Sequence, residues 1–288
     1  MKIWSAATAV ILILPCLAVG QDVPTFRVDS RLVEVYTTIR DGDGHYVDGL
    51  TKERFEIRDN GEPQPILTFD AVTERLSCAV LLDTTGSMAA ALPTVKNSVI
   101  RMIDELRVQD RIALFSFSTS LNQLQAFTTD RAAAKQAVLR SRASGDTALF
   151  DSISAVAREI EKEDGKKAIV LFTDGDDNAS VLNIRNGVQR AKKAGIPVYA
   201  IAEGDALKSR NLMTQLKDIA ESTGARLYEA RKTADITSIF GDITSDLEHT
   251  YMLAFKAPPS TDSKWHSIDL KVDGVKGLRI RSRQGYLP

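Results

Sequence analysis

Residues 76–106 read LSCAVLLDTTGSMAAALPTVKNSVIRMIDEL, and this segment establishes the class of the fold. Its first seven residues, Leu76 to Leu82, are almost continuously apolar, which is typical of a strand buried on both faces of a parallel sheet. After a polar loop, apolar residues recur at the spacing of one helix face, at Leu92, Val95, Val99, Met102, Ile103 and Leu106. The segment is therefore predicted to form a buried strand, a loop and an amphipathic helix.

The same alternation continues toward the C-terminus. Further strands are predicted for the apolar runs 112–117, 168–172, 198–202 and 227–228. Helical spacing of apolar residues predicts helices that begin near Leu149, Ile184, Leu212 and Ile236. We therefore predict an α/β domain over residues 76–250, with right-handed crossovers, a doubly wound and mostly parallel sheet, and helices on both faces.

The segments on either side of this domain are rich in predicted strands. Residues 21–75 contain β-rich runs separated by two turn sequences, Asp41-Gly42-Asp43-Gly44 and Asn60-Gly61. The first turn is followed by His45 and lacks the ligand pattern of an EF-hand, so a plain turn is expected. Residues 251–288 contain three more strand-like runs. We expect the two flanks to pair into one antiparallel sandwich of about seven strands, with the α/β domain as an insertion. Two independent β-extensions are the alternative.

The first twenty residues have the pattern of an export signal. Lys2 supplies a positive charge, Ala6 to Val19 is mostly apolar, and Ala18-Val19-Gly20 places small residues before a cleavage site. The apolar stretch is shorter than the ~20 residues that a membrane span needs, so cleavage is expected rather than an uncleaved anchor. The mature protein is expected to have no membrane span and to be periplasmic or extracellular, either free or associated with the cell surface.

Composition excludes several classes of function. The chain has 288 residues, with 37 Lys and Arg against 38 Asp and Glu. Its net charge of −1 lacks the basic excess that a general nucleic-acid binder needs. Its two cysteines, Cys16 and Cys78, exclude a disulfide scaffold. Its three histidines, at 45, 249 and 266, form no pair at helical spacing, which argues against a zinc hydrolase.

Three loops next to the predicted strands and helices are rich in oxygen ligands. They read Asp83-Thr84-Thr85-Gly86-Ser87, Ser144-Gly145-Asp146-Thr147 and Thr173-Asp174-Gly175-Asp176-Asp177. In a doubly wound sheet, such loops meet beyond the carboxyl ends of the strands. Carboxylates and hydroxyls without a nearby Cys or His are hard ligands, which suit Mg²⁺ and secondarily Mn²⁺ or Ca²⁺. The sequence therefore predicts a divalent-cation site at this edge.

This pattern resembles the metal-ion-dependent adhesion site of von Willebrand factor type A domains. The resemblance rests on Asp83-x-Thr85-x-Ser87, with Thr147 and Asp174 on later loops, and it covers about residues 76–250. The usual first motif is Asp-x-Ser-x-Ser, so Thr85 is a departure that retains the hydroxyl. The flanks, including Val47-Asp48-Gly49-Leu50, also resemble those of exported bacterial proteins called VWFA-related.

The resemblance implies a binding function rather than an enzyme. Asp83, Thr85, Ser87, Thr147 and Asp174 would hold the ion, directly or through water. Two carboxylates only balance its charge, so the ion stays electron-poor toward a remaining open coordination position. An Asp or Glu carboxylate of a partner protein can occupy that position. We therefore expect a metal-dependent protein-interaction or adhesion module.

Two other interpretations are open at this stage. Asp83 could instead be the nucleophile of a haloacid-dehalogenase-type phosphatase, with Asp174 and Asp177 holding Mg²⁺ and Lys166 or Lys167 steadying the phosphate. Thr85 stands where that class generally has a second Asp, which weakens this interpretation. The chain could also be a structural module that has lost metal binding.

Other polar residues have ordinary structural explanations. Asp146, Asp176 and Asp177 are expected to be solvated loop residues or helix caps rather than groups behind the metal ligands. Lys166 and Lys167 are expected to be solvated. Cys78 lies in the first buried strand and is expected to be an inert core thiol.

Overall fold

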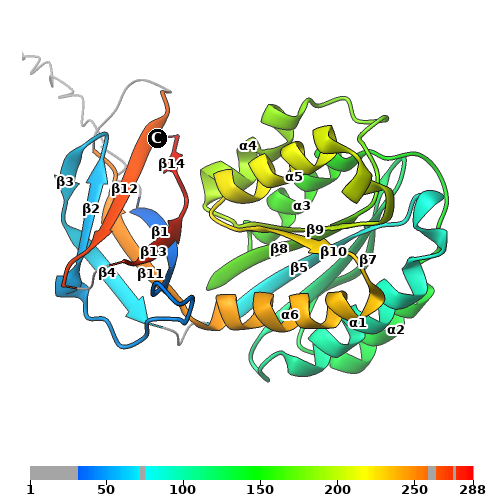
Figure 1. The fold of residues 1–288 in the computed structure, drawn as a ribbon, viewed down its shortest axis with the longest axis horizontal. Coiled ribbons are helices and arrows are strands. Elements are labelled where there is room, and N and C mark those ends of the chain that lie inside the picture. Colours follow the sequence, from blue (N-terminus) through cyan, green and yellow to red (C-terminus); the bar gives the residue numbers. More distant parts are fainter. Residues whose placement is uncertain (1–31, 72–74, 259–263, 275–276, 288) are drawn as a thin grey trace, which may run out of the picture.

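A computed structural model describes residues 32–71, 75–258, 264–274 and 277–287 (Figure 1). The predicted export signal lies outside these residues. Within them, no helix is both long enough and apolar enough to cross a membrane. Two bodies lie next to each other, a β-sandwich on the left of Figure 1 and an α/β domain on the right.

The central sheet of the α/β domain has the strand order β10-β9-β8-β5-β6-β7. Neighbouring strands are parallel except for β6 and β7, which form an antiparallel pair at one edge. Every residue of β5 is buried, as the apolar run predicts. The strands are β5 (Leu76–Asp83), β6 (Arg111–Phe117), β7 (Leu121–Thr128), β8 (Lys166–Thr173), β9 (Val198–Glu203) and β10 (Leu227–Ala230).

Helices cover both faces of this sheet. Alternate residues of β5 point to opposite faces, so Val80 packs beneath α1, α2 and α6, whereas Leu81 packs beneath α3, α4 and α5. The predicted doubly wound fold is confirmed. The helices are α1 (Leu92–Glu105), α2 (Arg131–Arg140), α3 (Leu149–Ile160), α4 (Ile184–Ala194), α5 (Arg210–Ser222) and α6 (Thr233–Glu248), with short 3₁₀ turns η1 (Lys52–Arg54), η2 (Ser87–Ala89) and η3 (Gly204–Lys208).

Sequence analysis missed two elements of this domain, β7 and α2. Strand β7 lies at the edge of the sheet and is only partly buried, so it lacks the continuous apolar run of the inner strands. Helix α2 buries only Ala134, Ala137 and Val138, and its small side chains give a weak amphipathic pattern.

The two flanks of the chain pair into one sandwich, as predicted, and not into separate extensions. Strand β1 of the N-terminal flank lies between β11 and β13 of the C-terminal flank, and β12 pairs with β2. The two sheets have the orders β13-β1-β11-β4 and β14-β12-β2-β3. The strands are β1 (Leu32–Arg40), β2 (Phe55–Asp59), β3 (Glu62–Gln64), β4 (Ile66–Ala71), β11 (Thr250–Lys256), β12 (His266–Val272), β13 (Arg279–Ser282) and β14 (Gly285–Tyr286).

Both predicted turns lie in this sandwich. Asn60 and Gly61 join β2 to β3, and their positive φ angles of 49° and 87° are those of a tight hairpin turn. In the turn after β1, the Asp41 carboxylate accepts hydrogen bonds from the backbone amides of Asp43 and His45, at 3.0 and 2.9 Å. Asp41 therefore stabilises its own turn, as expected for a plain loop.

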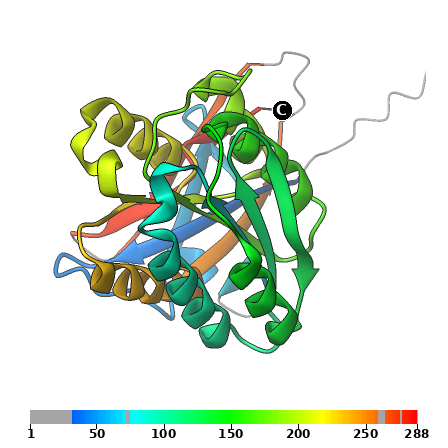
Figure 2. The ribbon, with the colours of Figure 1, turned by 90° about the vertical axis from the view of Figure 1, so that its right-hand side faces the viewer.

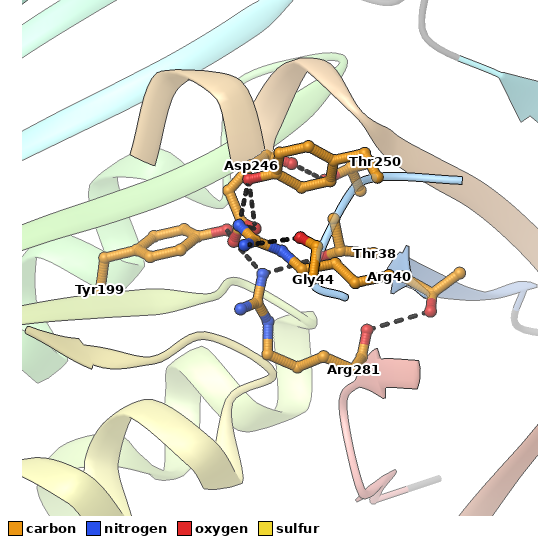
Figure 3. Close-up of polar contacts among 9 residues, drawn as sticks. Thr38, Arg40, Gly44, Tyr199, Asp246, Thr250 and Arg281 are labelled. Carbon is orange, nitrogen blue, oxygen red and sulfur yellow. Dashed lines mark hydrogen bonds and ion pairs between the residues drawn. The ribbon is translucent and has the colours of Figure 1, made fainter. Parts of the chain in front are cut away.

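A buried carboxylate, Asp246 near the end of α6, joins the two bodies (Figure 3). From the sandwich, Arg40 and Arg281 form ion pairs with it, and the Tyr46 hydroxyl donates to it at 3.1 Å. From β9, the Tyr199 hydroxyl donates to its second oxygen at 2.9 Å. Residues from three parts of the chain thus converge on one side chain of α6.

Two further buried side chains test the sequence-based expectations. Lys166 was expected to be solvated, which is wrong: it is 2% exposed, and its Nζ donates to the Thr250 carbonyl at 2.8 Å. It therefore ties the start of β8 to the start of β11. Cys78 is fully buried, and burial raises the pKa of its thiol to about 12, as expected for an inert core thiol.

Helices α3 and α4 approach each other closely at Gly187, where a Cβ would lie 2.7 Å from Cβ and 2.8 Å from the carbonyl oxygen of Phe150. We expect Gly187→Ala to lower the free energy of unfolding by about 1–3 kcal/mol, because the added methyl must push α3 away. The matched control is Gly241→Ala in α6, where a Cβ meets no atom within 4 Å. It is expected to be neutral or to add up to about 1 kcal/mol through helix propensity. Urea unfolding measures both, and a Gly187→Ala protein as stable as the Gly241→Ala protein would contradict the close packing.

Candidate functional site

The oxygen-rich loops meet at the end of the α/β domain that lies away from the sandwich. Strands β5 and β8 are parallel neighbours, so the residues that follow them emerge side by side. The start of β8 contacts the sandwich through Lys166, and its other end therefore points away from the sandwich. This end faces the viewer in Figure 2. It is where a doubly wound sheet generally binds ligands.

Four of the five predicted site residues form one continuous chain of hydrogen bonds. The Thr85 hydroxyl donates to Asp83 Oδ1 at 2.7 Å and lies 3.0 Å from the Ser87 hydroxyl. The Ser87 hydroxyl in turn donates to Asp174 Oδ1 at 2.7 Å. The alternation of Asp83, Thr85 and Ser87 therefore places all three side chains on one side of the loop, facing Asp174. The threonine that departs from the usual motif keeps its hydroxyl in this chain.

Thr147, the fifth predicted residue, reaches the same place from the loop before α3. Its backbone amide donates to Asn178 Oδ1 at 2.8 Å, and its carbonyl accepts from the amides of Asn178 and Ala179 at 3.0 Å. Its hydroxyl would lie 3.4 Å from a Cβ at Gly175, the residue after Asp174. These hydrogen bonds use only the backbone amide and carbonyl of Thr147. Its side-chain hydroxyl is therefore available for a ligand.

Sequence analysis missed two residues of the site. The Thr173 hydroxyl donates to Asp83 Oδ2 at 2.7 Å, so both oxygens of that carboxylate are held. Glu203 ends β9, the neighbour of β8, and its Oε2 is buried without a hydrogen-bond partner among the described residues. Each is a polar residue at the end of a predicted strand, which could have indicated a site residue. A single Thr or Glu in that position is common, however, so it does not distinguish a site from an ordinary strand end.

The site carries several negative charges, and no positively charged side chain of the described residues forms an ion pair with Asp83, Asp174 or Glu203. Burial raises the pKa of Asp83, against the lowering effect of the hydrogen bonds from Thr173 and Thr85. Burial also raises the pKa of Asp174, and the charges of Asp83 and Asp205 add to this. For Glu203, burial and then the charge of Asp174 raise the pKa.

These residues fit a divalent cation. Two carboxylates and three hydroxyls from three loops supply the oxygen ligands that Mg²⁺, Mn²⁺ or Ca²⁺ prefer. A cation beside them would offset the burial and mutual repulsion that raise the pKa values of Asp83 and Asp174. The orphaned oxygen of Glu203 is a further negative group in the same region, of the kind that a water on the ion would satisfy.

The other acidic loop residues have the structural roles expected of them. Asp177 Oδ2 accepts a hydrogen bond from the Phe150 amide in the first turn of α3, at 2.9 Å. Asp177 therefore caps the helix that follows Thr147. Asp146 and Asp176 are exposed, and Asp176 lies 3.5 Å from the Ser209 hydroxyl.

The geometry argues against the phosphatase interpretation. Lys166 and Lys167 lie at the start of β8, whereas Asp174 follows its end, about 25 Å away at the rise of an extended strand. Neither lysine can therefore reach a phosphate held at Asp83. The Asp83 side chain is also fully buried, with both oxygens hydrogen-bonded, which does not suit a nucleophile that must meet a substrate.

Comparison with known proteins relates most of the α/β domain to one domain family. The family model of the von Willebrand factor type A domain matches residues 78–242. An uncharacterized protein of Escherichia coli, YfbK, is 26% identical in an alignment of 183 residues that covers 58% of this chain and 32% of that protein. Human integrin alpha-X is 27% identical over 163 residues, which are 57% of this chain and 13% of integrin alpha-X. The chain thus matches a third or less of each of these relatives.

Solved structures share the fold. A von Willebrand factor type A protein from Catenulispora acidiphila superimposes with a TM-score of 0.54 at 14% identity, covering 88% of this chain and 73% of that chain. The corresponding domain of the type V pili tip protein Mfa5 from Porphyromonas gingivalis superimposes with a TM-score of 0.51 at 13% identity, covering 61% of this chain and 95% of that chain. At these identities the likeness concerns the fold alone.

Proposed function

The chain belongs to the von Willebrand factor type A domain family, and on that premise we propose that it binds a partner protein through a divalent cation. The family is one of protein-interaction and adhesion modules. In our proposal, Asp83, Thr85, Ser87, Thr147 and Asp174 hold Mg²⁺, and an Asp or Glu carboxylate of the partner completes its coordination. Mn²⁺ or Ca²⁺ would suit the same oxygen ligands.

One observation carries this proposal: the unbroken hydrogen-bond chain from Asp83 through Thr85 and Ser87 to Asp174. It brings carboxylates and hydroxyls of two loops together at a negatively charged place where Asp83, Thr85 and Asp174 are buried and Ser87 is exposed. Thr173 orients Asp83 from behind, and Asn178 fixes the backbone of Thr147, so the ligand groups are held before any ion arrives. Such preorganisation reduces the entropic cost of binding.

The cation would supply positive charge and an open coordination position for the partner's carboxylate. The residues of this chain do the rest. Asp83 and Asp174 together balance the ion's two charges, which leaves it able to attract a third carboxylate. The neutral hydroxyls of Thr85, Ser87 and Thr147 complete the ligand set without adding negative charge that would repel the partner.

We also propose that the protein works outside the cytoplasm. This rests on the predicted signal at residues 1–20 and on the names of similar structures, which include a pili tip protein and a minor pilin from Streptococcus sanguinis.

Affinity capture on purified protein tests the function. Proteins retained from an extract of the source cells with Mg²⁺ should elute when the ion is chelated. Replacing the partner's recognised Asp or Glu with Asn or Gln should abolish retention. Retention that is equal with Mg²⁺ and with chelator would refute coordination as the basis of binding.

Thr147→Ala gives a sharper version of this experiment. It removes a hydroxyl while the backbone bonds of Thr147 remain, so capture should weaken about tenfold with little change in thermal stability. Ser144→Ala removes an exposed hydroxyl from the same loop and is the matched control. Equal capture by both variants would remove Thr147 from the site.

A further inference from the structure

A polar cavity lies between the sandwich and the α/β domain, and arginines dominate its wall. Its volume is about 510 Å³. Strands β1 and β13 line it from one side, and the C-terminal end of α5 with the loop to β10 lines it from the other. The wall includes five arginines and one acidic residue, namely Arg40, Arg226, Arg279, Arg281, Arg283 and Glu221.

Two of these arginines share a single carboxylate. Arg40 and Arg281 both pair with Asp246, as Figure 3 shows. The two arginines and the one carboxylate together therefore carry a net charge of +1. The Nε atoms of both guanidinium groups are buried and have no hydrogen-bond partner in the described part of the chain. This end of the cavity is therefore positively charged, and it contains two buried hydrogen-bond donors without acceptors among the described residues.

Arg226 and Arg279 add two further positive charges. Arg226 lies over the ring of Tyr228, 5.7 Å from its centroid, and Arg279 Nη2 donates to the Gly42 carbonyl at 3.5 Å. Neither guanidinium forms an ion pair with any residue that the structure describes. The one acidic wall residue, Glu221, already has a partner in Lys217, at 3.8 Å.

The arginines are close enough to repel one another. Burial lowers the pKa of Arg281, and the neighbouring charge of Arg226 contributes in the same direction. Arg281 remains charged at neutral pH, because a guanidinium group is too basic to lose its proton there. A concave site with about three uncompensated positive charges attracts an anion with more than one negative charge most strongly.

We infer that this cavity binds a ligand through a phosphate group. The planar guanidinium group donates paired hydrogen bonds in the spacing of phosphate oxygens, so several arginines around one cavity suit this chemistry. A phosphate monoester carries a charge near −2 at neutral pH, which matches the excess better than a single carboxylate does. The cavity exceeds the size of a phosphate ion, so it has space for the organic part of a phosphate ester.

This site is separate from the proposed metal site. The arginines lie where the α/β domain meets the sandwich, whereas Asp83 and Asp174 lie at the opposite end of the sheet. A ligand in one site therefore contacts no residue of the other. The two proposals fail or succeed in separate experiments.

Calorimetric titration of the purified protein tests the inference, after metal is removed and the protein is exchanged into chloride buffer. The probes are inorganic pyrophosphate, glycerol phosphate and, for comparison, citrate. Vesicles of phosphatidic acid in phosphatidylcholine test whether the phosphate comes from a lipid headgroup, with pure phosphatidylcholine as reference. We expect saturable binding of a soluble phosphate compound, of the phosphatidic acid vesicles, or of both.

Paired substitutions localise that binding. The double variant Arg226→Gln/Arg279→Gln breaks no ion pair, so it should fold and bind at least about tenfold more weakly. The double variant Arg158→Gln/Arg185→Gln removes the same charge from exposed helix positions and should bind as the wild type does. The inference is overturned if wild-type protein saturates with no phosphate probe, if citrate binds as tightly as the phosphate compounds, or if both double variants lose binding equally.

Discussion

Asp83→Asn should strongly weaken Mg²⁺ binding while leaving the metal-free protein at least as stable as the wild type. The substitution removes one of only two carboxylates that would hold the ion, and we expect the affinity for Mg²⁺ to fall about a hundredfold or more. The fold should tolerate it because Asn retains an oxygen that accepts the hydrogen bonds from Thr85. Its amide group can donate to Thr173, whose hydroxyl then acts as the acceptor.

The pKa of Asp83 decides the sign of the stability change. Burial raises this pKa, which means that the ionised carboxylate costs stability in the metal-free protein. That cost is present above the folded-state pKa and is relieved as the pH falls through it. At neutral pH the neutral Asn avoids the cost, so metal-free Asp83→Asn should melt at the same temperature as the wild type or higher.

Calorimetric titration with MgCl₂ and melting curves with and without Mg²⁺ check both parts of this result. Asp176→Asn is the matched control, since Asp176 is exposed on the same loop as Asp174. It should bind Mg²⁺ within about twofold of the wild type. Unchanged Mg²⁺ affinity in Asp83→Asn would remove Asp83 from the site. A wild-type protein that gains no stability from Mg²⁺ would instead favour the structural module without metal.

Asp246→Ala should destabilise the protein by about 3–5 kcal/mol, because it leaves Arg40 and Arg281 without their shared carboxylate. The hydroxyls of Tyr46 and Tyr199 would lose their acceptor as well. Asp246→Asn keeps the shape and one acceptor oxygen, so its loss should be smaller. Contacts between the sandwich and the α/β domain should therefore be lost at a lower urea concentration than the helices of the α/β domain.

Urea unfolding with two probes measures this effect. Trp265 is the one tryptophan beyond the predicted export signal, and its ring contacts Lys192 of α4 across the two bodies, at 4.6 Å from the ring centroid. Its fluorescence should change at a lower urea concentration in Asp246→Ala, whereas the far-ultraviolet signal of the helices should follow later. Asp242→Ala, at an exposed position of the same helix, should stay within about 0.5 kcal/mol of the wild type. Equal midpoints for the two alanine variants would contradict the role of Asp246.

The α/β fold was predictable because its signals are local. A parallel strand buried on both faces is apolar along most of its length, and Leu76 to Leu82 shows this directly. Edge elements escape the same reasoning, since β7 and α2 are held mainly by their neighbours and carry weak patterns of their own. The contact of Lys166 with Thr250 was equally invisible, because 84 residues separate them in sequence.

For the candidate site, the family resemblance predicted all five residues, and the alternation of Asp83, Thr85 and Ser87 within one loop already implies that these three share a side of the backbone. Sheet topology then determined that Asp174 and Thr147 join them, because β5 and β8 become neighbours only when the crossovers form. Tertiary structure alone decided that Glu203 lies near this group, and that arginines from three separate segments surround one cavity. The physical reason is that a short loop's chemistry is encoded in adjacent residues, whereas burial, charge excess and shared carboxylates arise only when distant segments pack together.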